Sequence, residues 1–168
     1  MAELAPRERL QPSLLDRLTD HEPDKAVEAR ERRVLSERGL REGVLRDLAW
    51  LLNTTNLQST GELPALPHLA GSVLNYGLPA ISGVSLANME RADLERAIRQ
   101  AIWDFEPRLI RSSVSVKAMA AQGSTSKIVF EIEADLWAQP YPERLYLKTE
   151  LDLDLGQLSL LDSGGARA

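Results

Sequence analysis

Few side chains in this sequence could carry out chemistry, and they are scattered. The two histidines, His21 and His68, stand in proline-containing or irregular surroundings, and neither has a second histidine at helical spacing. A zinc site needs clustered histidine, cysteine and carboxylate ligands, and the chain has no cysteine. Glycine-rich phosphate loops and the zinc-binding HExxH motif are also absent from the sequence. We therefore expect neither a metal site nor a cofactor.

Paired carboxylates are the second chemistry to consider, because two of them can hydrolyse a glycosidic bond. Glu95, Asp104 and Glu106 lie on or near one expected helix. The chain holds 25 acidic residues, so some pair always exists, and separation in sequence says nothing about separation in space. Asp152 and Asp154 resemble a calcium loop only weakly, since the later carboxylate of such a loop is missing. We expect no catalytic residue in this chain.

The segment Glu106-Pro107-Arg108 joins the best helix of the sequence to its best β-run. Pro107 stops the helix, because the residue before a proline is pushed out of the α region. In one interpretation the two charges form a local surface ion pair worth about 0–1 kcal/mol. In the other, the proline presents them to a partner, whose carboxylates would bind the planar arginine fork. The residues alone favour the local ion pair.

Composition limits the classes of function. The net charge of -5 argues against the basic surface that nonspecific nucleic-acid binding needs. No apolar run approaches the roughly 20 residues of a membrane-spanning helix. The first residues lack the apolar core of a signal peptide, and without cysteine there are no disulfides. We expect a cytoplasmic protein with no nucleic-acid partner, no membrane insertion and no small-molecule substrate.

Two segments have the apolar spacing of amphipathic helices. The first runs from Leu40 to Asn53. The second follows Asn88, a residue type that caps helices, and ends at Phe105. Their apolar stripes are Val44, Leu45, Leu48, Leu51 and Leu52, and then Leu94, Ala97, Ile98, Ala101, Ile102 and Phe105. Between the two helices, residues 54–85 are punctuated by proline and glycine, and a loop this long inside a compact domain is often functional.

After Pro107 the apolar period changes from 3.6 to 2. Alternating runs begin at Ile110, Ile128 and Leu145, and a shorter run follows an expected turn at Gly156. Strict alternation indicates strands with one face on a core and the other in water. Short loops join these runs, so an antiparallel meander of three to four strands is the simplest pairing. We predict an α+β fold, with helices packed on one face of this small sheet.

The composition changes along the chain divide it into three parts. Residues 1–35 form a charged, proline-punctuated N-terminal extension, and residues 36–162 form the α+β domain. Residues 163–168 form a tail that we expect to be disordered.

One short amphipathic patch stands out in the N-terminal extension. Leu14, Leu15 and Leu18 follow Pro12 and Ser13 and share one face at helical spacing. This helix either packs on its own domain or docks on a partner, and the sequence leaves both interpretations open.

Three motifs occur in order along these elements. They are RDLAWLLNT at residues 46–54, SVLNYGLP at residues 72–79 and FEPRL at residues 105–109. With these motifs the chain resembles the TssE family, the baseplate subunits of type VI secretion systems. It is also similar to the wedge-protein family of contractile phage-tail baseplates. The early PSLLDRL at residues 12–18 fits the same resemblance, which covers residues 12–160.

The resemblance implies assembly rather than catalysis. Such proteins join the baseplate wedge to the first layer of the contractile sheath, so the implied partners are the wedge subunits TssF, TssG and TssK and the sheath subunits. The family's Glu-Pro-Arg motif, here Glu106, Pro107 and Arg108, contacts a helical bundle of neighbouring wedge subunits. Family members have also been called lysozyme-like, and the alternative function is a peptidoglycan-degrading hydrolase. One departure is Thr55, where the family often has arginine.

The resemblance also implies that a sheath strand adds to the sheet, because the family's β-elements are similar to part of a sheath subunit. Strand addition needs an exposed edge, whose main-chain groups supply the affinity. Our candidate is the run from Leu145 to Leu160. Its candidate sheath-binding residues are Leu145, Leu147, Thr149, Leu151 and Leu153. The sequence does not say which strand forms the edge.

Overall fold

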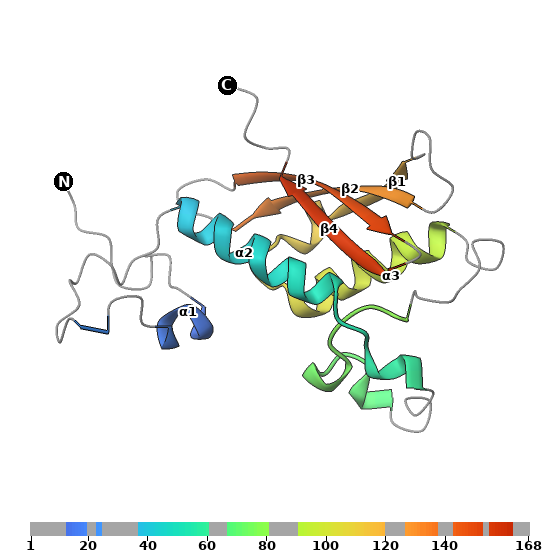
Figure 1. Ribbon diagram of the computed structural model, residues 1–168, viewed down its shortest axis with the longest axis horizontal. Helices are drawn as coiled ribbons and strands as arrows, with labels where there is room; N and C mark the ends of the chain where they lie inside the picture. The colour runs from blue at the N-terminus through green and yellow to red at the C-terminus, as the bar shows by residue number, and fades with distance from the viewer. Residues whose placement is uncertain are drawn as a thin grey trace.

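A computed structural model gives the fold as α+β, with a four-stranded antiparallel sheet lying over two long helices (Figure 1). The described residues are 13–19, 23–24, 37–60, 67–80, 91–119, 127–137, 143–152 and 155–162. The long helices are α2 (Glu37–Leu52) and α3 (Arg91–Phe105), and both cover the same face of the sheet. The predicted fold class is therefore confirmed. No helix within the described ranges is long and apolar enough to cross a membrane.

The sheet is a meander in which each strand pairs with the next one along the chain. Its strands are β1 (Ser115–Met119), β2 (Lys127–Leu136), β3 (Glu143–Asp152) and β4 (Gln157–Asp162), in the order β1-β2-β3-β4. Burial alternates strictly along β2, as the period of two predicts. The apolar side chains of the sheet therefore face α2 and α3.

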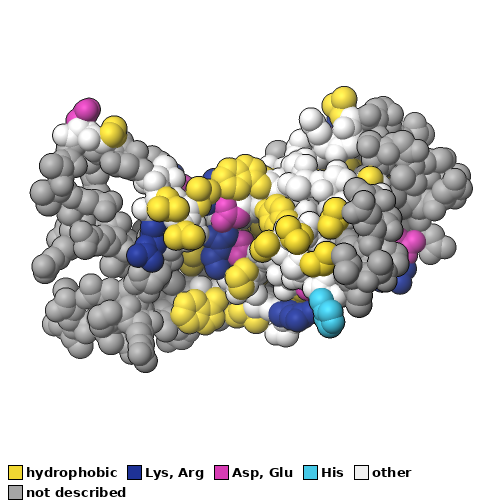
Figure 2. All heavy atoms as spheres, turned by 90° about the horizontal axis from the view of Figure 1, so that it is seen from below, with side chains coloured by type: hydrophobic (Ala, Val, Ile, Leu, Met, Phe, Trp, Pro, Cys, Tyr) yellow, Lys and Arg dark blue, Asp and Glu magenta, His cyan; other side chains and the backbone are white. Residues whose placement is uncertain are grey.

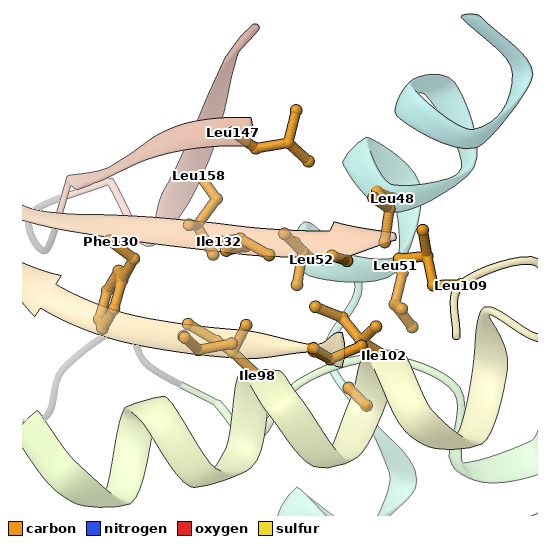
Figure 3. Packing of buried hydrophobic residues seen from close by; sticks show 14 of the residues in the cluster. Leu48, Leu51, Leu52, Ile98, Ile102, Leu109, Phe130, Ile132, Leu147 and Leu158 are labelled. Atoms are coloured by element: carbon orange, nitrogen blue, oxygen red, sulfur yellow. The ribbon is translucent and has the colours of Figure 1, made fainter. Parts of the chain in front are cut away.

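The core fills the space between the helices and the sheet. In Figure 3, Ile98 and Ile102 of α3 lie below Ile132 of β2, and Leu48 and Leu51 of α2 lie to its right. All five side chains are at most 1% exposed, and each contributes about 1.5–3 kcal/mol to folding by leaving water. The apolar residues at helical spacing thus form the side of the core that α2 and α3 provide, and the alternating apolar residues of the strands form the side that the sheet provides.

The prediction of the first strand is wrong in its first part, before Ser115. The alternation from Ile110 predicts one continuous strand, but Arg111–Ser113 forms a 3-10 turn, η7, and β1 begins only at Ser115. The Ser113 hydroxyl donates to Ile110 O at 2.7 Å and accepts from the Asp135 N–H at 2.7 Å. A serine side chain offers the backbone an alternative to the ladder, and here it replaces the strand bonds at that point.

The irregular stretch after α2 contains the short 3-10 helices η3 (Leu57–Thr60), η5 (Pro67–Leu69) and η6 (Val73–Asn75), which lie below the long helices in Figure 1. An isolated parallel bridge joins Thr55 to Leu78. The Leu78 N–H donates to Thr54 O at 2.8 Å, and Leu78 O accepts from Asn56 N at 2.8 Å.

Few residues of the N-terminal extension are described, and the short helix α1 (Leu14–Leu18) is among them. Ser13 caps it, because the Ser13 hydroxyl accepts from the Asp16 N–H at 3.3 Å. Figure 1 shows α1 below α2 and apart from the sheet. The boundaries of the extension and of the tail stay predictions, since residues 163–168 and most of 1–35 lie outside the described part of the chain.

Gly77 holds the bridge between Thr55 and Leu78 in place. Its φ of 117° lies in the region that favours glycine, and a Cβ there would lie 2.2 Å from Thr54 O. We expect Gly77→Ala to lower the free energy of unfolding by at least about 2 kcal/mol, measured by urea denaturation. Gly71→Ala is the matched control, because nothing lies within 4 Å of that Cβ. Equal stability of the two variants would contradict this account.

Candidate protein-binding site at the Glu-Pro-Arg corner

The Glu-Pro-Arg corner is fastened to a helix on one side and to the sheet on the other. The Glu106 N–H donates to Ile102 O at 2.9 Å, which continues the bonding of α3 by one residue. Arg108 O accepts from the Trp137 N–H at 2.8 Å, and the next residue, Leu109, bridges to Leu136 at the end of β2. Pro107 lies between these two anchors and is exposed. The corner is therefore a rigid junction between α3 and the sheet.

The two charges of the corner bind each other directly. The Arg108 guanidinium contacts both carboxylate oxygens of Glu106, from Nε at 2.7 Å and from Nη2 at 2.5 Å. The Arg108 main-chain N–H also donates to Glu106 Oε1, at 3.1 Å. Glu106 is only 3% exposed, whereas the side chain of Arg108 is 23% exposed. The predicted ion pair is thus present, but its carboxylate is buried rather than on the surface.

The ion pair continues into α2 and on to α1. Arg108 Nη2 donates to Asp47 Oδ2 at 2.6 Å, and Arg46 Nε donates to the other oxygen of Asp47 at 2.9 Å. Arg46 Nη1 then donates to Asp16 Oδ1 of α1 at 2.5 Å. We call the resulting series Glu106, Arg108, Asp47, Arg46 and Asp16 the charge chain. Its signs alternate, so each charge has an opposite neighbour.

Charge and burial act together on the pKa values along the charge chain. Burial alone would lower the pKa of Arg108, but its hydrogen bond with Glu106 and then its contact with Asp47 raise it overall. The hydrogen bond from Arg46 holds the pKa of Asp16 below its usual value. Both groups therefore stay charged over a wider pH range than in water.

Tyr76, from the irregular stretch after α2, contacts the charge chain at Asp47. Its hydroxyl donates to the main-chain oxygen of Asp47 at 3.4 Å, and its ring meets Phe105 edge to face, with centroids 5.3 Å apart. Burial raises the pKa of Tyr76, and the nearby carboxylates of Asp47 and Glu106 add to the shift. Tyr76, Asp47 and Phe105 come from the three motifs that carry the family resemblance, so those motifs meet at one place.

The surface around the charge chain is apolar. Figure 2 shows acidic and basic side chains on the underside of the molecule, lying between groups of hydrophobic ones. Leu14 and Leu18 of α1 are 72% and 74% exposed, and α1 has no buried residue. Val73 of η6 and Trp50 of α2 are also exposed. The leucines of α1 therefore do not pack α1 on the described domain, and the contact of α1 with α2 runs through Asp16.

The family profile for the baseplate wedge protein gp25 matches residues 38–141. The chain belongs to this family of baseplate wedge proteins. The match includes α2, α3, the Glu-Pro-Arg corner, β1 and β2, and with them every member of the charge chain except Asp16. No curated protein and no solved structure matches the chain.

The predicted sheath-binding residues of this wedge-family protein lie in an inner strand. β3 pairs with β2 along its whole length, and from Leu147 to Asp152 it also pairs with β4. At most 2% of each predicted side chain in the described part of β3 is exposed: Leu145, Leu147, Thr149 and Leu151. Leu153 lies outside the described residues. A new strand therefore cannot pair with β3 from Leu147 to Asp152, where both sides of the strand are already paired, and β4 is the outer strand at this end of the described sheet.

The carboxylates considered for hydrolysis have separate structural roles. Glu95 Oε1 accepts from the Ala118 N–H of β1 at 2.7 Å, and Asp104 accepts from the Gln100 side chain at 2.9 Å. Glu106 belongs to the charge chain. His68 is exposed in η5, and His21 lies outside the described residues. Among the described residues no group of three or more histidines and carboxylates could hold a metal ion.

Sequence reasoning did not single out Asp47, Arg46 or Asp16, and of these Asp47 is the one that contacts the corner directly. It stands within RDLAWLLNT, and its charge alone places it on the polar face of α2. Helical spacing predicts which face a residue occupies, but not that a corner 61 positions later supplies its partner. The signal that could have pointed to Asp47 is the pair of adjacent opposite charges, Arg46 and Asp47, within one of the three motifs that carry the family resemblance.

The burial of Glu106 predicts a large cost for losing its charge. Glu106→Gln keeps the shape of the side chain but removes its negative charge, so that of the two acidic partners of Arg108 Asp47 remains. We therefore expect a loss of about 2–4 kcal/mol in the free energy of unfolding. Glu150→Gln is the matched control, because its pair with Lys127 is exposed on both sides. Urea denaturation should show almost no change for the control. A loss no larger than that of the control would mean that the corner pair is not structural.

The contact between α1 and α2 depends on pH through Asp16. Because the folded pKa of Asp16 lies below its ordinary 3.8, the contact is complete above pH 3.8 and is lost as the pH falls through the folded value. The pair is partly exposed, so its contribution is at most about 1 kcal/mol.

The guanidinium of Arg46 lies 5.2 Å from the ring centroid of Trp50, so Trp50 emission reports the release of Asp16. We expect this emission to change below pH 3.8 in a chain whose other two tryptophans are phenylalanine. Asp16→Asn should show the changed emission at neutral pH. Identical acid titrations of both proteins would argue against the contact.

Proposed function

We propose that this protein is a structural subunit of the baseplate of a type VI secretion system, a contractile injection machine, and that it acts in the cytoplasm. It joins the baseplate wedge to the contractile sheath and templates the assembly of the sheath. The membership in the wedge family carries this proposal. No catalytic role is part of it, because the candidate carboxylates are held by separate partners within the fold.

On the wedge side, the Glu-Pro-Arg corner is the proposed contact with TssF, TssG and TssK. Glu106 is buried, so its role is to hold Arg108 in one orientation. Pro107 and the exposed part of Arg108 remain available to a partner. A guanidinium fixed in this way loses little conformational freedom on binding, which favours affinity. The local ion pair and the partner contact are thus two uses of the same residues.

The leucines of α1 form the second proposed wedge contact. Leu14, Leu15 and Leu18 are exposed at 72%, 44% and 74%. An amphipathic helix can bind a partner by laying its exposed apolar face into a hydrophobic groove. Asp16 ties α1 to the charge chain, so the leucines and the corner would meet the same neighbouring subunit.

On the sheath side, we propose strand addition at β4 instead of β3. β4 is the outer strand that closes the predicted run, and no strand among the described residues pairs with its outer edge. Main-chain groups at such an edge can bind an extended segment of another chain. In this form of sheath templating, the main-chain groups of β4 supply the affinity.

The wedge contact is tested by capture of the purified chain on the assembled wedge subunits. We expect the double variant Glu106→Ala, Arg108→Ala to stay folded, since Asp47 keeps Arg46 as a partner, but to lose at least about tenfold in affinity. The matched control is Asp135→Ala, Arg144→Ala, which removes the same charges from a pair on β2 and β3. Circular dichroism checks that both variants are folded.

The pattern of capture separates the two wedge contacts. Equal capture of the folded double variant and the wild type would remove the corner from the proposal. Leu14→Ser, Leu18→Ser would then test α1 as the main contact. No capture of the wild type by wedge subunits would contradict the baseplate role itself.

A further inference from the structure

Each outer edge of the described sheet carries a hydrogen bond to a helix side chain. At the β1 edge, the Ala118 N–H donates to Glu95 of α3. At the β4 edge, the side chain of Asn53, just after α2, binds both main-chain groups of Leu158. Its Nδ2 donates to Leu158 O at 2.9 Å, and its Oδ1 accepts from the Leu158 N–H at 2.9 Å. The Asn53 amide therefore occupies the place that one residue of a fifth strand would take.

The contact with Asn53 fixes which way the groups of β4 point. In an antiparallel ladder both main-chain groups of a residue point to the same side, and the side alternates along the strand. Leu158 directs its N–H and C=O to Asn53, away from β3. Leu160 and Asp162 must then also direct theirs outward, while Ser159 bonds to β3.

The far edge of the sheet gives an independent check of this alternation. Ala118, Phe130, Thr149 and Leu160 are successive partners across the four strands. If Leu160 points outward, Thr149 and Phe130 bond to each other and Ala118 points outward at the opposite edge. The Ala118 N–H does so, because it donates to Glu95.

We propose that the outer edge of β4 accepts an extended strand of another chain at Leu160 and Asp162, and that the Asn53 amide ends this pairing at Leu158. The inference rests on the proposed function, under which the added strand belongs to a sheath subunit. The β1 edge is the less suitable one, because Glu95 occupies Ala118 and only Val116 also points outward in this five-residue strand. Asn53 thus fixes the register of the added strand.

The side chains of β4 define the kind of strand that fits. Leu160 is half-buried and packs against the core, while Ser159 is exposed on the other face. Residues directly opposite each other on one face interact, so the added residue beside Leu160 must be apolar. Its neighbours face water and are polar. The partner is therefore a short amphipathic strand rather than a fully apolar one.

Amide hydrogen exchange, followed by NMR on the full chain, tests the inference. In the chain alone, the Leu158 amide should exchange slowly and the Leu160 and Asp162 amides quickly. Asn53→Ala should speed exchange at Leu158 by about tenfold, because its acceptor is lost. Thr54→Ala is the matched control, since among the described residues the Thr54 hydroxyl donates to Trp50 O of α2 and not to β4, and its loss should leave Leu158 unchanged.

The second half of the experiment adds purified sheath subunit, with complex formation measured first by sedimentation. In the complex, the Leu160 and Asp162 amides should become protected, and in Asn53→Ala the Leu158 amide should regain protection as the strand extends. A complex that leaves Leu160 and Asp162 fast overturns this inference but keeps the sheath link. Slow exchange at Leu158 in the folded Asn53→Ala chain overturns the role of Asn53. Absence of a complex with wild type removes the sheath link and this inference with it.

Discussion

The structure depends on one buried carboxylate. Glu106 is 3% exposed at the end of α3, and an unpaired charge there would cost several kcal/mol. Arg108 compensates it from two residues away, and this requires the sharp turn that Pro107 provides. Glu106 binds two of the five guanidinium N–H donors, and Asp47 of α2 binds another, on Nη2. Pairing one buried charge therefore fixes the angle between α3, the sheet and α2.

The alternating charges of the charge chain connect the buried Glu106 to partly exposed residues at the surface. Every other member is more exposed than Glu106, with side chains that are 22% to 35% exposed, so the outer contacts contribute less than the buried pair. The inner end is structural, and the outer end, at Asp16, is weak enough to open. This difference between the buried inner pair and the partly exposed outer contacts explains how one series of charges can hold a rigid corner and also a short helix.

Periodicity predicted most of the fold, because burial of one face is a local property of the chain. The stripes of α2 and α3 and the alternation of the strands all appear in the core. Periodicity could not predict which strand lies at the edge, since β3 and β4 alternate alike and only pairing distinguishes them. It also missed the turn at Ser113, where a side-chain hydroxyl replaces ladder bonds. Of the charge chain, the motif singled out Glu106 and Arg108, whereas Asp47, Arg46 and Asp16 were not predicted, and the binding role of the corner stays a prediction.

The two edges of the sheet differ in the chemistry that covers them. A carboxylate such as Glu95 can accept the N–H of Ala118, but it has no donor for a carbonyl. An amide such as Asn53 has one acceptor and two donor hydrogens, so it satisfies both groups of Leu158 as a peptide unit would. Its Nδ2 also bonds to Ala49 O, which anchors the amide to α2. The residue that follows α2 therefore takes the place of a strand residue at one position of β4, so a strand added to this edge could not pair past Leu158.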